Sequence, residues 1–70
     1  MIRGEELRAA IRAVLEAAAR PLTVGEIHRG LVARGVRPGG RSSHAISNAL
    51  AVEIRAGRAA RDHRGVDRAA

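Results

Sequence analysis

Four residues in the segment 42–55 recur at the spacing of one face of an α-helix. They stand at i, i+4, i+7 and i+11: His44, Asn48, Ala51 and Arg55. The imidazole, amide and guanidinium offer hydrogen-bond donors and acceptors, and the small Ala51 lets another surface approach closely. Such a face can reach the base edges of duplex DNA in a groove. The same pattern also fits an ordinary solvated helix face, and both interpretations stay open at this point.

Basic and hydroxyl-bearing residues flank this helical face at both ends. Hydroxyls and free N–H groups at a helix N-terminus suit phosphate oxygens, and so do arginines that follow the helix. Together these residues make up the predicted duplex-DNA site: Arg41, Ser42, Ser43, His44, Ser47, Asn48, Ala51, Arg55, Arg58, Arg61 and Arg64.

Catalytic and metal chemistry find little support in the sequence. Residues 35–42 imitate a phosphate-binding loop with Arg in place of Lys, but that loop needs a preceding strand, and here a helix is expected before it. His28, His44 and His63 show no metal-ligand spacing, and the chain has no cysteine. No nucleophile, base and orienting residue stand together. We therefore expect no enzymatic activity, no metal and no cofactor.

The charge balance favours a polyanionic partner. The 70-residue chain has thirteen Arg, no Lys and a net charge of +6, and residues 41–70 hold six of those Arg against three acidic residues. An excess of positive charge on one helix and the tail is typical of nucleic-acid contact. Single-stranded nucleic acid is not the expected partner, because such sites rely on aromatic stacking and the chain has no Phe, Tyr or Trp.

Composition also predicts the compartment. A chain without Cys fits a reducing cytoplasm. No window approaches the roughly 18 apolar residues of a membrane span, and the first six residues lack the apolar run of a signal peptide. We expect one cytoplasmic domain over residues 1–70, with no membrane partner, that associates with the nucleoid if it binds DNA.

A first supporting helix is predicted over residues 5–19. Its apolar residues fall on one face and indicate a scaffold helix: Leu7, Ile11, Val14, Leu15 and Ala18. Glu16 and Arg20 are four residues apart in the favourable order for an ion pair on that helix.

A second helix is predicted over residues 24–34. Thr23 and Glu26 form a capping box that opens it, Gly35 is placed for the left-handed conformation that ends it, and Val36 can make the accompanying apolar contact. Gly30 can permit the close approach of another helix.

The third helix, over residues 43–56, carries the candidate face outward and a different face inward. The inward residues are Ile46, Ala49, Leu50, Glu53 and Ile54. Since Glu53 is the charged member of this set, we expect it to form a salt bridge with a neighbouring Arg. Ala45 and Val52 form a small apolar strip that can pack on the first helix or on a second protomer.

A short hairpin is predicted within residues 58–68, around a turn at 62–65. Ala, Asp and Arg are poor strand formers, and only Val66 favours a strand there.

The order of these elements resembles a winged helix-turn-helix, closest to the small HARE-like winged helices and bacterial regulator domains. The resemblance covers nearly the whole chain and is carried by residues 21–27, 35, 45–50, 53–55, 57–58 and 64–66. It implies a mainly α fold of three helices and a short C-terminal β-hairpin wing, in which the second helix of the pair binds duplex DNA. The chain departs from its relatives at Ala59 and Ala60, where β-branched residues are frequent, and at Asp67, where an aromatic is usual.

Two functions therefore compete. The first is a duplex-DNA-binding module of a transcriptional regulator. The alternative is a winged helix used for protein interaction or for dimerisation through the strip of Ala45 and Val52, without sequence-specific DNA binding.

Overall fold

Three helices and a hairpin make up the part of the chain that the computed structural model describes, residues 4–37, 42–62 and 65–70. In chain order the elements are α1 (Glu5–Ala18), α2 (Val24–Ala33), α3 (Ser42–Arg55), β1 (Ala59–Arg61) and β2 (Asp67–Ala69). The predicted succession of helices and hairpin is confirmed, with each helix boundary within one residue of its expected place. None of the helices in these ranges combines the length and the apolar character that crossing a bilayer requires.

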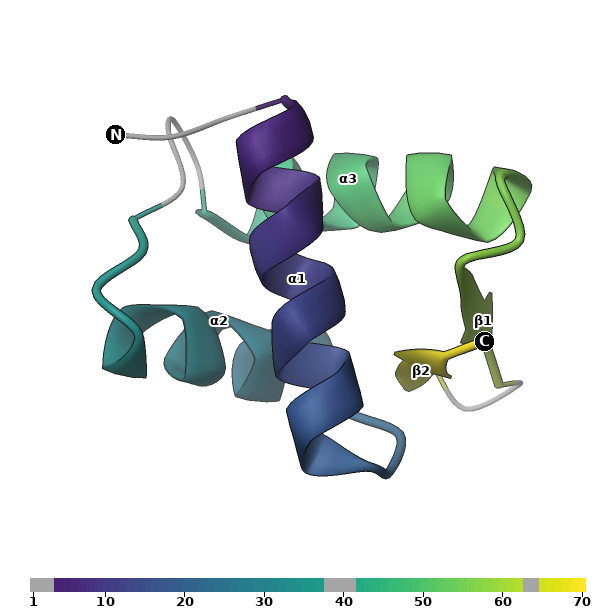
Figure 1. Cartoon of the computed structure of the whole chain (residues 1–70), viewed down its shortest axis with the longest axis horizontal. Coiled ribbons are helices and arrows are strands. Elements are labelled where there is room, and N and C mark those ends of the chain that lie inside the picture. The colour runs from purple at the N-terminus through teal and green to yellow at the C-terminus, as the bar shows by residue number, and fades with distance from the viewer. Residues whose placement is uncertain (1–3, 38–41, 63–64) are drawn as a thin grey trace.

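The helices surround a common interior, and the hairpin closes one side of it. Figure 1 shows α1 running across both α2 and α3, with the hairpin below the C-terminal end of α3. β1 contacts α3, whereas β2 contacts α1. The hairpin therefore bridges the first and third helices.

The sheet is antiparallel and is extended by one residue of the α1–α2 connection. Ala59 pairs with Ala69 and Arg61 with Asp67. On the other side of β2, Leu22 and Asp67 exchange two N–H···O=C bonds of 2.7 Å each. This bridge ties the hairpin to the connection between α1 and α2, which explains how a segment of poor strand formers is held extended.

The ends of α2 follow the predicted capping rules. Thr23 and Glu26 make both bonds of the capping box. Past α2, Gly35 has φ 75° and the Val36 N–H donates to the Leu31 carbonyl at 2.9 Å, the Schellman arrangement. The C-terminus of α3 repeats this arrangement around Gly57, which has φ 78°.

The expected ion pair between Glu16 and Arg20 is wrong. α1 ends at Ala18, because Ala19 takes a left-handed φ of 54° and its N–H bonds back to the Leu15 carbonyl. Arg20 has left the helix, so the spacing of four residues no longer brings it to Glu16. Its guanidinium instead lies 3.4 Å from Glu26.

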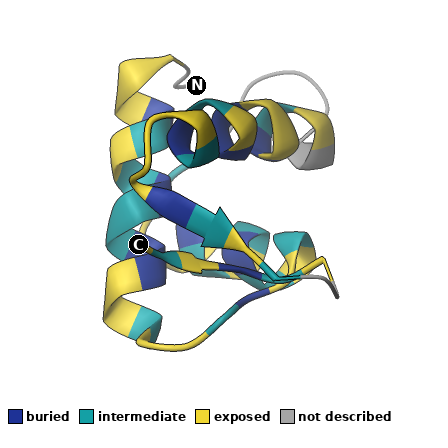
Figure 2. Cartoon of the chain, turned by 90° about the vertical axis from the view of Figure 1, so that its right-hand side faces the viewer, coloured by how far each residue is buried: buried dark blue, intermediate teal, exposed yellow. Residues whose placement is uncertain are grey.

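The core is aliphatic, and every helix and strand contributes to it. Figure 2 shows buried residues on the inner sides of the helices and on the strands. The buried apolar residues are Leu7, Ile11, Val14, Leu15, Leu22, Ile27, Leu31, Ile46, Ala49, Leu50 and Ala59. Two charged residues, Glu53 and Asp67, are as deeply buried as these.

Gly30 sets how closely α2 approaches α1. A Cβ at this position would lie 2.7 Å from Val14 Cγ1, inside any normal carbon–carbon contact. Val14 is buried and β-branched, so its χ1 is restricted and it cannot easily move aside. Gly25, on the same helix, has no such neighbour, since its Cβ would meet Thr23 Oγ1 at 3.9 Å.

These two glycines provide a matched test of the packing. Gly25→Ala should raise the free energy of unfolding by up to about 1 kcal/mol through helix propensity. Gly30→Ala gains the same propensity but overpacks the contact with Val14, so a net loss of about 1–2 kcal/mol is expected. Urea denaturation of both variants measures the difference. Equal stabilisation by both would contradict the close approach of α1 and α2.

Candidate nucleic-acid interface

The predicted face of α3 is the one that faces solvent. Its residues are all exposed: His44, Ser47, Asn48, Ala51 and Arg55. Ile46, Leu50 and Glu53, on the opposite side of the helix, have 0% exposure. The division of α3 into inward and outward faces is thus confirmed, while contact of the outward face with DNA stays a prediction.

Within this face, Arg55 is the residue best placed to offer a charge to a ligand. It lies in the last turn of α3 and forms no ion pair with another described residue. Asn48 stands two turns earlier on the same side, with Ala51 between them. The face therefore offers an amide and a guanidinium across a small residue that leaves room for a ligand.

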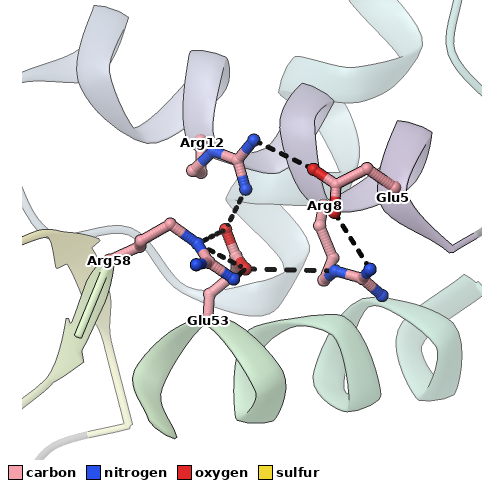
Figure 3. Close-up of polar contacts among 5 residues, drawn as sticks. All are labelled: Glu5, Arg8, Arg12, Glu53 and Arg58. Carbon is pink, nitrogen blue, oxygen red and sulfur yellow. Dashed lines mark hydrogen bonds and ion pairs between the residues drawn. The ribbon is translucent and has the colours of Figure 1, made fainter. Parts of the chain in front are cut away.

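The buried carboxylate of Glu53 anchors α3 on the side opposite the outward face. Arg58 Nε donates to both carboxylate oxygens, at 3.1 and 3.0 Å, and Arg58 Nη2 donates to Oε2 at 2.6 Å. Arg12 Nη1 donates to Oε1, and Arg8 Nε lies 4.0 Å from Oε2. Figure 3 shows these arginines converging on Glu53, with Glu5 joining Arg8 and Arg12 on the solvent side. The expected salt bridge of Glu53 is confirmed, and it joins α1, α3 and the start of the hairpin.

These contacts keep Glu53 ionised despite its burial. Hydrogen bonds from Arg58, and then from Arg12, lower the pKa of Glu53 from 4.5 to about 2, against the opposite effect of desolvation. In an intact buried pair, the attraction between the charges roughly offsets the free energy of desolvating them. Removal of one partner leaves a buried charge uncompensated and destabilises the fold. Glu53 therefore makes the position of α3 depend on α1 and on Arg58.

A second buried carboxylate holds the hairpin. Arg61 Nε and Nη2 donate to the two oxygens of Asp67, at 2.9 and 3.2 Å. The backbone of Asp67 is the one that pairs with Leu22. Sequence reasoning missed this role, although Asp67 stands opposite Arg61 in any hairpin with a turn at residues 62–66.

The described arginines of the hairpin are therefore not freely available. The sequence predicts phosphate contacts for Arg58 and Arg61, but in the structure both side chains pair with buried carboxylates. Their side chains remain 46% and 45% exposed, so a phosphate contact by either one stays a prediction. Arg41 and Arg64, and the side chains of Ser42 and Ser43, lie outside the described residues.

The apolar strip of Ala45 and Val52 lies on the side of α3 that is next to α1. Ala45 packs against the core, and both residues are half-buried. Together with Leu7 and Arg8 they line a hollow of about 230 Å³ between α1 and α3. Packing of the strip on a second protomer stays a prediction.

Within the described ranges, no three His, Cys, Asp or Glu side chains lie close enough together to hold a metal ion. Comparison of the chain with protein-family models, with curated proteins and with solved structures finds no match.

The pH dependence of stability tests the Glu53 cluster. Since folding lowers the pKa of Glu53 from 4.5 to about 2, its contribution is complete above about pH 4.5 and is lost as the pH falls towards 2. Glu53→Gln should lower the free energy of unfolding at neutral pH by about 2 kcal/mol. It should also flatten the loss of stability in acid.

Urea titrations at neutral and acidic pH measure both effects. Glu16→Gln is the matched control, because Glu16 is exposed and pairs with no other described residue. If Glu53→Gln and Glu16→Gln have the same pH profile as the unsubstituted protein, Glu53 is not the ionised centre described here.

Proposed function

We propose that the protein is a winged helix-turn-helix module that binds duplex DNA, within a transcriptional regulator. The observation that carries the proposal is the exposed face of α3, where His44, Asn48 and Arg55 stand on a helix that buried ion pairs hold from behind. A rigid helix with polar groups on its free side is the element that such modules place in the major groove.

The order and pairing of the elements support this reading. α2 and α3 correspond to the helix-turn-helix, α1 to the scaffold helix, and β1 with β2 to the wing. Leu22 pairs with β2 at the position where winged helices often have a short strand. Because fold likeness alone does not determine function, the weight of the proposal rests on the residues of α3.

In this proposal α3 lies in the major groove of the duplex, and positively charged side chains near it contact the phosphates of the DNA backbone. The Asn48 amide can donate to and accept from one adenine edge, and Ala51 lets the helix approach the groove floor. Arg55 reaches either a guanine edge or a phosphate. The net charge of +6 supplies the long-range attraction.

The first test is binding of mixed-sequence duplex DNA. We expect micromolar or tighter affinity at about 50 mM salt and a steep loss by about 200 mM, since each phosphate contact releases counterions. Fluorescence anisotropy of a labelled duplex measures both. A folded protein with no detectable duplex binding at the lower salt would overturn the proposal.

The second test separates reading of bases from attraction to phosphates. Asn48→Ala should reduce discrimination among sequences by about 1–3 kcal/mol while leaving the salt slope nearly unchanged. Arg55→Ala should weaken binding and reduce that slope by about one if Arg55 contacts a phosphate. Arg61→Ala is unsuitable for this test, because it would also leave the buried Asp67 without its partner.

The competing function gives a different result in the same series. If Asn48→Ala and Arg55→Ala leave DNA binding unchanged while Val52→Asp dissociates a dimer or a protein complex, α3 serves protein interaction and the DNA-reading role is wrong. Sedimentation velocity of the unsubstituted protein and of Val52→Asp measures this outcome.

A further inference from the structure

A groove between α1 and α2 lies apart from the candidate interface. It has a volume of about 470 Å³, and its lining residues belong to α1, to α2 and its C-cap, and to the connection between the two helices. Val14 and Leu22, both buried, close its floor. No residue of the outward face of α3 lines it, so a ligand there does not compete directly with that face.

Small residues line this groove from both helices, beside longer charged side chains. Ala17 and Ala18 line it from α1, and Gly30 and Ala33 line it from α2. Small side chains let a third helix bring its backbone close to both walls. An extended peptide would gain less, because both walls are helices whose backbone groups are already bonded internally and offer no strand edge.

The charge at the rim identifies the partner. Arg29 and Arg34 border the groove, are exposed and form no ion pair with another described residue. Arg20 and Glu26 also line the groove, and their charges are paired with each other. Arg29 belongs to α2 and Arg34 is its C-cap residue, so both positive charges lie on the α2 side of the groove.

We propose that this groove binds an acidic amphipathic helix of a partner protein. Its small apolar residues would pack between α1 and α2, and its carboxylates would pair with Arg29 and Arg34. A second copy of this chain is disfavoured as the occupant, because each copy carries a net charge of +6 and like charges repel. A nucleic acid would pair with the arginines but would leave the apolar floor uncovered. The proposal is independent of DNA binding by α3.

The probe is a fluorescein-labelled synthetic peptide of about 16 residues, long enough to run the length of α2. It carries Leu and Ala on one helical face and Glu along both edges. A scrambled peptide of identical composition keeps the charge but loses the apolar face. We expect saturable micromolar binding of the amphipathic peptide and at least about tenfold weaker binding of the scrambled one, since only the first can bury apolar area.

The groove is tested with two double variants that remove equal charge. Arg29→Ala with Arg34→Ala should weaken the amphipathic peptide by about tenfold, whereas Arg37→Ala with Arg55→Ala should change its affinity by less than about threefold, as expected for charges outside the contact. Arg37 and Arg55 are also without an ion pair to another described residue, and neither lines the groove.

Several outcomes would overturn the proposal. These are the absence of saturable binding, equal binding of the scrambled peptide, and equal losses in the two double variants. Two further results would assign the groove to another occupant. If the unsubstituted protein is a dimer that the double variant Arg29→Glu with Arg34→Glu dissociates, the occupant is a second copy of the chain. If Arg29→Ala with Arg34→Ala loses affinity for duplex DNA but not for the peptide, the occupant is DNA. Failure of duplex binding alone would leave the groove proposal standing.

Discussion

Burial of the Glu53 carboxylate is the constraint on which the arrangement of the helices and the hairpin depends. An isolated ionised carboxylate without solvent contact would cost a large part of the stability of so small a domain. Arg12 and Arg58 offset that cost, and they come from α1 and from the start of the hairpin. One carboxylate on α3 therefore fixes three parts of the chain, and it does so through hydrogen bonds that are sensitive to direction as well as distance.

Some of the described arginines pair with buried carboxylates, and others form no ion pair with another described residue. Net charge alone therefore does not locate the surface whose positive charge is free to meet a ligand. Arg12, Arg58 and Arg61 hold buried carboxylates. The arginines that pair with no other described residue lie on α2, just after it, and at the end of α3: Arg29, Arg34, Arg37 and Arg55. The hairpin is rich in Arg, yet the arginines described there mostly stabilise the fold. Among these four arginines, Arg29 and Arg34 border the groove between α1 and α2, Arg55 lies on the outward face of α3, and Arg37 lies on neither surface.

The parts of the structure that follow local rules could be predicted from the sequence, and the parts that depend on distant residues could not. The capping box at Thr23 and the glycine at position 35 locate the ends of α2, and the helical period assigns Glu53 to the buried face. The period cannot identify Arg12 as its partner, because the two residues are 41 positions apart. Nor can strand propensity explain β2, whose Asp67 is held by Arg61 and by the backbone of Leu22. The helical period predicted which residues of α3 face outward. It could not predict which of the nearby arginines pair with buried carboxylates.

The absence of aromatic residues explains why charged pairs carry so much of the organisation. An aliphatic core of this size buries little area per residue, and small residues such as Gly30 and Ala49 let the helices approach without fixing their rotation. The rotation of α3 decides which side chains face outward. The buried apolar residues Ile46 and Leu50 turn one side of α3 inward, and the directional hydrogen bonds to Glu53 on the same side further constrain its angle. Glu53 thus helps to set which side chains of α3 face outward, although its own carboxylate lies on the buried side of the helix.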